Sequence, residues 1–225
     1  MAIILNIDTS TEFASVALSK DREIVGFTSH EHQKNHGAFL QPAIQQICKD
    51  AGIEIQQIQA VAVANGPGSY TGLRIGLSSA KGLCYALNIP LITVSTLQVI
   101  AKAVIDNCSE NALANNALFC PMIDARRMEV FTGIYDKNLH IVEEEKPFII
   151  TETSFLEQLN SNKIIFCGNG SEKIKAVITH QNAMYSSIQH NAKHLAILAD
   201  NHYKKKAFSD LSYTEPTYLK AFFTG

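Results

Sequence analysis

The chain has 225 residues, of which 46% are hydrophobic and 18% are charged, and its formal net charge is -2. This composition is ordinary for a globular chain with a hydrophobic core, and the length allows one large domain or two small lobes. The only run of three basic residues is Lys204-Lys205-Lys206, which suits a solvated helix end. The slightly negative net charge therefore argues against a protein that binds nucleic acid without a partner.

The five cysteines lie at positions 48, 84, 108, 120 and 167, and no two of them form a C-x-x-C pair. Neither a zinc ribbon nor a redox motif is indicated, and an odd count at irregular spacing fits reduced thiols. No apolar run is long enough to span a membrane, and the early residues lack the pattern of a signal peptide. We therefore expect a cytoplasmic protein without a membrane partner.

The first hundred residues alternate between predicted strands and helices. Strands are expected over residues 2–8, 13–19, 23–28, 60–65 and 91–94. Helices are expected over residues 37–51, from a cap at Thr71 to about 87, and from a cap at Ser95 to about 106. This β-β-β-α-β-α-β-α order predicts an α/β fold of the actin-like, ribonuclease-H-like (ASKHA) kind, in which mixed sheets are flanked by helices.

Residues 107–116 are polar and rich in Asn, which favours a boundary between two lobes. Further strands are expected over residues 118–123, 128–135, 141–150 and 164–167, with short helices between and a final helix over about 190–206. The predicted domains are a first lobe (1–107, joined by the final helix), a smaller second lobe (108–189) and a C-terminal tail (207–225).

The most informative stretch is the glycine-rich turn that begins at Gly66-Pro67-Gly68 and leads into a helix. One helix face is apolar, at Leu73, Leu77, Ala80, Cys84 and Leu87. A second face is uncharged and small, and its members are Gly72, Ile75, Ser79, Gly82 and Ala86. A surface helix needs only one buried face. The small face is therefore predicted to be a partner interface, and the alternative is a helix buried among elements of its own chain.

Five segments carry a resemblance to the TsaB family that spans nearly the whole chain. They are residues 4–11, the glycine stretch 66–76, Asp124 to Phe131, Gly168-Asn169-Gly170, and Glu215 to Lys220. The resemblance implies a non-catalytic partner of TsaD, which transfers a threonylcarbamoyl group to the adenosine beside the anticodon of tRNA. It further implies the ATPase TsaE as third component and no cofactor, and it leaves open whether the isolated chain forms a homodimer. The charge balance indicates that tRNA is reached only through a partner.

Asp8, Ser10 and Thr11 sit in the first turn, where actin-like kinases hold phosphate and magnesium. Hydroxyl and backbone N–H groups suit phosphate oxygens. However, Thr9 stands where these kinases have a glycine after the acid, and its side chain narrows the space through which a nucleotide could approach. These residues and the Gly168-Asn169-Gly170 turn are weak candidates for nucleotide binding, and a hairpin end held by hydroxyl–backbone bonds is the alternative.

Histidines form two candidate metal clusters. His30, His32 and His36 form an H-x-H-x-x-x-H pattern that suits zinc or nickel, and a polar strand-to-helix turn is the alternative reading. His190 and His194 stand four residues apart on a predicted helix, but no third ligand is placed by the sequence.

Several catalytic classes are disfavoured by what the sequence lacks. In TsaD a histidine pair on the helix after the fifth strand binds the active-site metal, whereas residues 93–102 contain no His, Cys or acid. Asn65 stands where a ribonuclease-H-type enzyme needs a second carboxylate, and Ser69 lacks the G-x-S-x-G pattern of a hydrolase. A self-sufficient ATP-dependent small-molecule kinase stays the best enzymatic alternative.

Overall fold

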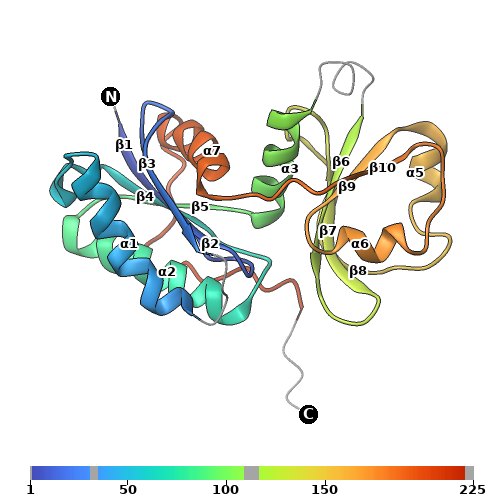
Figure 1. The fold of residues 1–225 in the computed structure, drawn as a ribbon, viewed down its shortest axis with the longest axis horizontal. Helices are drawn as coiled ribbons and strands as arrows, with labels where there is room; N and C mark the ends of the chain where they lie inside the picture. Colours follow the sequence, from blue (N-terminus) through green and yellow to red (C-terminus); the bar gives the residue numbers. More distant parts are fainter. Residues whose placement is uncertain (1, 31–34, 109–116, 221–225) are drawn as a thin grey trace, which may run out of the picture. The chain divides into compact units, whose positions relative to one another are not determined.

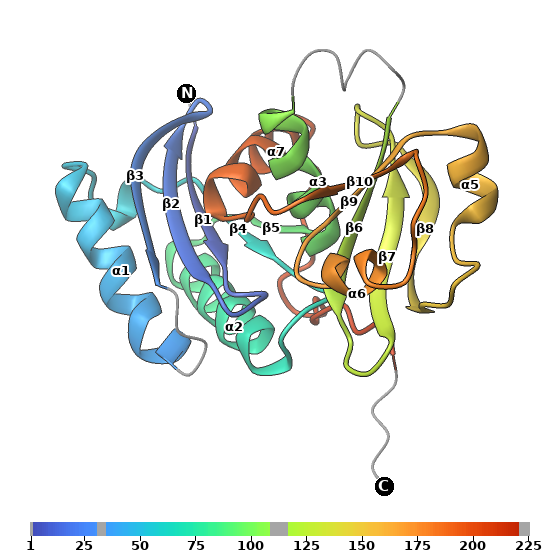
Figure 2. The same cartoon turned by 45° about the vertical axis from the view of Figure 1, so that its right-hand side comes forward.

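The computed structural model describes residues 2–30, 35–108 and 117–220 (Figure 1). The chain divides into two compact units, the first formed by residues 1–99 with 191–217 and the second by residues 100–190 with 218–225. Each unit holds one five-stranded sheet with helices packed on it (Figure 2). The domain limits expected from the sequence stay a prediction. None of the helices within the described ranges has the length and apolar character that a membrane span requires.

The sheet of the first unit is mixed, with strand order β3-β2-β1-β4-β5. Its strands are β1 (Ile3–Asp8), β2 (Ala14–Lys20), β3 (Glu23–His30), β4 (Ala60–Ala64) and β5 (Leu91–Val94). The first three form an antiparallel meander, while β4 pairs parallel to β1 and β5 parallel to β4. Because β4 is buried at every residue, it reads as a continuous apolar run rather than an alternating one.

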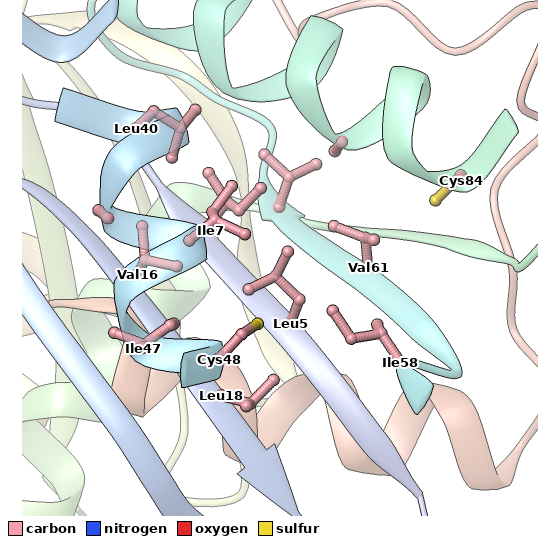
Figure 3. Packing of buried hydrophobic residues seen from close by; sticks show 14 of the residues in the cluster. Leu5, Ile7, Val16, Leu18, Leu40, Ile47, Cys48, Ile58, Val61 and Cys84 are labelled. Atoms are coloured by element: carbon pink, nitrogen blue, oxygen red, sulfur yellow. The ribbon is translucent and has the colours of Figure 1, made fainter. Parts of the chain in front are cut away.

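Two helices pack on one face of this sheet, and one packs on the other (Figure 1). The first pair is α1 (His36–Asp50) and α2 (Tyr70–Leu87), and a short 3-10 turn, η2 (Ile55–Gln57), lies between α1 and β4. Leu5, Leu40 and Val61 belong to the cluster between the pair and the sheet (Figure 3). Burying each such side chain contributes about 1.5–3 kcal/mol. The opposite face is covered by α7 (Ala192–Lys204).

The sheet of the second unit repeats the topology of the first. Its strands are β6 (Leu118–Asp124), β7 (Glu129–Tyr135), β8 (Ile141–Ile149), β9 (Ile164–Cys167) and β10 (Ala183–Ser186). β6, β7 and β8 form an antiparallel meander, and β9 and β10 continue it in parallel on the other side of β6. The helices are the C-terminal part of α3 (Thr96–Asn107), α5 (Leu156–Ser161) and α6 (Ser171–Lys175). The predicted actin-like fold is confirmed.

Two local expectations were wrong. Ser69, not Thr71, is the N-cap of α2, because the Ser69 side chain accepts a hydrogen bond from the Gly72 N–H at 3.3 Å. The sequence also gave no sign of β10, a short strand whose residues are mostly half-buried. By contrast, Ser95 precedes α3 as expected, and its hydroxyl accepts a hydrogen bond from the Leu97 N–H at 3.1 Å.

Candidate functional site

The turn between β4 and α2 is held against the first hairpin. Gly66 has a left-handed backbone with φ of 108°. A Cβ atom at Gly68 would lie 2.2 Å from the Ser10 carbonyl oxygen, which no side chain can tolerate. The same oxygen accepts a hydrogen bond from the Ser69 N–H at 2.7 Å. These glycines are therefore required by close backbone approach within the chain.

The first hairpin turn is closed by its own polar groups. The Asp8 carboxylate accepts hydrogen bonds from the Ser10 N–H at 3.1 Å and from the Ser10 hydroxyl at 2.6 Å. Asp8, Thr9, Ser10 and Thr11 are all buried. The hydroxyl of Thr9 donates to the Gly72 carbonyl at 2.7 Å. The hydroxyls of Thr9 and Ser10 are thus engaged by the chain itself, as at a hairpin end, whereas the buried Thr11 hydroxyl has no hydrogen-bond partner among the described residues.

Two glycines of α2 form a notch that receives Thr9. A Cβ atom would lie 2.1 Å from the Thr9 carbonyl oxygen at Gly72, and 2.3 Å from the Thr9 hydroxyl oxygen at Gly76. Gly72 is therefore buried inside the chain and does not share an exposed surface with Gly82, which corrects its place in the predicted interface. The sequence could not show this contact, because its partner lies 63 residues away.

The remaining members of the predicted interface lie on the outer side of α2. We call Ile75, Ser79, Gly82 and Ala86 the α2 surface. Gly82 and Ala86 are exposed, while Ile75 and Ser79 are half-buried. A Cβ atom at Gly82 would meet nothing within 4 Å. An interior helix glycine costs about 0.8–1.0 kcal/mol relative to alanine, so Gly82 has a cost that no contact within the described chain explains.

The opposite side of α2 belongs to the core, as predicted. Leu77, Ala80 and Cys84 are part of the buried cluster against the sheet, and Leu73 is only 1% exposed. Burial raises the pKa of the Cys84 thiol to about 11, although a backbone hydrogen bond to Val61 acts in the opposite direction. This thiol is a packing residue.

The histidines are engaged in local contacts. The buried His36 ring lies with Nε2 2.8 Å from the Thr11 carbonyl oxygen, which ties the start of α1 to the first hairpin. The His30 ring packs against the Phe39 ring with centroids 5.5 Å apart. His32 lies outside the described residues. His194 caps α7, because its Nδ1 accepts from the Asn191 N–H at 3.1 Å. Within the described ranges no three His, Cys, Asp or Glu residues gather as a metal site.

The Gly168-Asn169-Gly170 turn follows β9 as the Gly66 turn follows β4. Gly168 has φ of 84°, and a Cβ atom there would lie 2.3 Å from the Met122 carbonyl oxygen. The Asn169 side chain accepts a hydrogen bond from the Asp124 N–H at 3.0 Å. The turn thereby fixes the start of the β6–β7 hairpin, and its role in nucleotide binding stays a prediction.

The similarity of this chain to known proteins shows its family. Residues 12–221 match the family model of TsaD, tRNA N6-adenosine threonylcarbamoyltransferase. A Bacillus subtilis (strain 168) protein, tRNA threonylcarbamoyladenosine biosynthesis protein TsaB, is 30% identical over 226 residues, which cover 96% of this chain and 93% of that protein. This chain belongs to the TsaB family. The match extends to a solved structure, YeaZ from Pseudomonas aeruginosa, with a TM-score of 0.84 and 25% identity over 97% of this chain and 100% of that one.

A more distant structure shares the fold of this TsaB-family chain. The activator of 2-hydroxyisocaproyl-CoA dehydratase from Clostridium difficile, solved with bound ADPNP, is 9% identical and has a TM-score of 0.50. The alignment covers 91% of this chain and 97% of the activator. At that identity the likeness shows the actin-like fold alone.

The C-terminal segment of this TsaB-family chain lies along the first unit, a placement that the sequence did not predict. Ser209 donates its backbone N–H to the Leu91 carbonyl at 2.8 Å, at the free edge of β5. The Lys81 ammonium group donates to the carbonyls of Ser212 and Thr214 at 3.2 and 3.1 Å.

Proposed function

We propose that this chain is a non-catalytic partner subunit that binds TsaD and supports threonylcarbamoylation of the adenosine beside the anticodon of tRNA. The observation that carries the proposal is Gly82, an exposed glycine inside α2. Among the described residues, an added Cβ atom there would meet nothing within 4 Å apart from its chain neighbours and the backbone of its own helix. A missing side chain at such a place lets the backbone of a second helix approach closely. The small face continues to Ala86, one turn further along α2.

We choose TsaD as the partner that binds the α2 surface because the two proteins are related in sequence. The family model that matches residues 12–221 is that of the transferase itself, so the two proteins are expected to share their fold. A related partner offers helices equivalent to α1 and α2, and two such pairs can pack about a pseudo-twofold axis. When TsaD is absent, the same surface can pair with a second copy of this chain, so a homodimer is an alternative state of the isolated protein.

Two features support a role without chemistry of its own. The Thr9 hydroxyl donates a hydrogen bond to the Gly72 carbonyl, and the Ser10 hydroxyl donates one to the Asp8 carboxylate. Both hydroxyls therefore stabilise the turn. The start of α3 uses its polar groups in the same way, since the Thr96 hydroxyl accepts from the Gly66 N–H at 3.1 Å. In this proposal the ATPase TsaE acts through the complex, and this chain needs no cofactor.

The test places a charge on the α2 surface. Gly82→Arg puts an unpaired cation into the proposed helix contact, at a cost of about 3–5 kcal/mol. Affinity for TsaD should fall by about two to four orders of magnitude, since each 1.4 kcal/mol is tenfold. Melting should change little, because the position is exposed in the free chain. Asn160→Arg, at an exposed position of α5, adds the same charge elsewhere and serves as the matched control.

Binding is measured by analytical ultracentrifugation with TsaD encoded by the same genome. Normal binding by Gly82→Arg, or equal loss in Asn160→Arg, contradicts the assigned surface. A tRNA modification assay with ATP, threonylcarbamoyl-adenylate and tRNA addresses the catalytic question. Modified tRNA formed by this chain without TsaD would overturn the non-catalytic role.

A further inference from the structure

The hairpin between β6 and β7 carries two neighbouring arginines in left-handed backbone conformations. The φ angles are 69° at Arg126 and 48° at Arg127. The turn is closed by two 3.1 Å backbone bonds, from the Ala125 N–H to the Glu129 carbonyl and from the Glu129 N–H to the Arg126 carbonyl. The second bond closes a β-turn whose central residues are Arg127 and Met128, so Arg126 lies just before the centre. A left-handed backbone favours glycine or asparagine, because other residues cost about 1–2 kcal/mol each there. The backbone therefore gives no reason for arginine at either position.

The base of this hairpin is anchored by paired charges. The Lys173 ammonium group lies 2.8 Å from the Asp124 carboxylate and also donates to the Glu129 carbonyl at 2.9 Å. The Lys220 ammonium group lies 2.7 Å from the Glu129 carboxylate. Each acid at the base thus has its own lysine, and neither acid is left over to neutralise the arginines at the tip.

Both arginines at the tip are exposed. Across residues 2–30, 35–108 and 117–220, neither guanidinium group has an ion-pair or hydrogen-bond partner. The tip therefore presents two uncompensated positive charges on an anchored support, in a chain whose overall charge is negative. Charges held in this way are available to a ligand without breaking an internal contact.

The shape and chemistry of the tip select the kind of ligand. Guanidinium groups bind phosphate oxygens with two parallel hydrogen bonds. Small-molecule sites are concave, whereas a hairpin tip projects, so the phosphates should belong to an extended ligand. Two adjacent arginines suit successive phosphates of a nucleic acid strand. We propose that Arg126 and Arg127 contact the phosphate backbone of tRNA once this chain is assembled with TsaD.

This inference rests on the proposed function and revises one of its expectations. The overall charge led us to expect that tRNA is reached only through TsaD, but a local pair of arginines can add to a surface that TsaD supplies. Phosphate contacts give affinity and register without reading sequence, so the contribution should be the same for different tRNAs.

The test uses a variant that removes both charges while improving the turn. Arg126→Asn/Arg127→Gly installs residues that tolerate the left-handed backbone at these two positions, so folding should be kept or strengthened. The matched control is Lys205→Asn/Lys206→Gly. It removes two exposed charges from the first unit and also places glycine at a left-handed position, since Lys206 has φ of 54°.

Each variant is assembled with TsaD, and binding of an unmodified tRNA transcript is titrated at several salt concentrations. Each lost phosphate contact lowers the slope of log K against log salt by about 0.9. The arginine variant should therefore have a slope smaller by about 1.8, and the wild type should lose about 12-fold more affinity between 50 and 200 mM salt. The lysine control should keep the wild-type slope.

Assembly with TsaD is measured separately, which keeps the two proposals distinguishable. A wild-type slope in the arginine variant refutes this inference alone, and so does an equal change in the lysine control. Loss of assembly in the arginine variant would show that the pair binds an acidic protein segment, which also refutes it. Failure of the wild-type chain to bind TsaD refutes the proposed function and this inference together.

Discussion

Gly76→Ala should destabilise the protein, although the same change at Gly82 should stabilise it. Both positions are interior to α2, so alanine gains about 0.8–1.0 kcal/mol of helix propensity at each. At Gly82 the new methyl group meets nothing within 4 Å. At Gly76 it would lie 2.3 Å from the Thr9 hydroxyl oxygen, inside a buried contact. The difference between the two variants isolates the packing of the notch.

The cost at Gly76 can be worked out from its neighbours. Overpacking a close-packed site costs about 1–3 kcal/mol. Displacing Thr9 also breaks its 2.7 Å hydrogen bond to the Gly72 carbonyl, which costs about 0.5–1.5 kcal/mol. After the propensity gain, the net loss is about 2 kcal/mol. In a chain of this size 1 kcal/mol moves the melting temperature by about 2–4 °C. Gly76→Ala should melt about 4–8 °C lower and Gly82→Ala about 2–4 °C higher.

The assay is thermal unfolding followed by circular dichroism, completed as a double-mutant cycle. Thr9→Ala removes the hydroxyl oxygen that the methyl group introduced at position 76 would meet. The double variant Thr9→Ala/Gly76→Ala should therefore recover more than about 1 kcal/mol relative to the sum of the single changes. Equal stabilisation by Gly76→Ala and Gly82→Ala would refute the notch, and so would strictly additive single and double variants.

Two further outcomes follow from charge and burial. Burial raises the pKa of Asp200, but hydrogen bonds and charges from Lys204 and Arg22 outweigh it, so the pKa lies below the ordinary 3.8. A lowered carboxyl pKa stabilises the fold above that value and loses this effect as the pH falls. Asp200→Asn should therefore melt lower than wild type at pH 7, with a gap that shrinks below about pH 3.8; a gap independent of pH would contradict the ion pairs. Burial raises the pKa of the Cys120 thiol to about 12 and also raises those of the other cysteines, of which only Cys108 is half-exposed. Iodoacetamide at pH 8 should label Cys108 alone in the native protein, as read by mass spectrometry, and labelling of Cys120 without denaturant would disprove the buried cluster.

The periodicity of the sequence was sufficient to predict the buried side of α2 and the order of strands and helices along the first unit. Leu73, Leu77 and Cys84 recur at helical spacing, and that spacing depends only on local geometry. The sequence predicted four of the five strands of the second sheet. It missed β10, because that strand is short and mostly half-buried. A strand of that kind has no strong alternation to detect.

Contacts between distant parts of the chain explain what sequence reasoning missed. Gly72 and Gly82 are the same residue type on the same helix, yet one is required by Thr9 and the other by nothing in the described chain. His36 was a weak metal-ligand candidate beside the reading as a polar turn, and its ring lies against the Thr11 carbonyl, 25 residues earlier, a contact that the sequence could not show. Ser69 and Thr71 carry equivalent hydroxyls, and only the backbone angles at Ser69 decide which one caps.

The path of the chain through the first unit also bears on the order in which the protein is made. That unit needs residues 191–217 in addition to residues 1–99, because α7 packs on β1, β2, β4 and β5. A ribosome releases the N-terminal half first, when the sheet has α1 and α2 on one face and no α7 on the other. Residues 100–190 form a nearly continuous unit and can complete their core before α7 is synthesised. The face of the first sheet that α7 covers thus stays uncovered until α7 has been synthesised, so the first unit completes its core after the second.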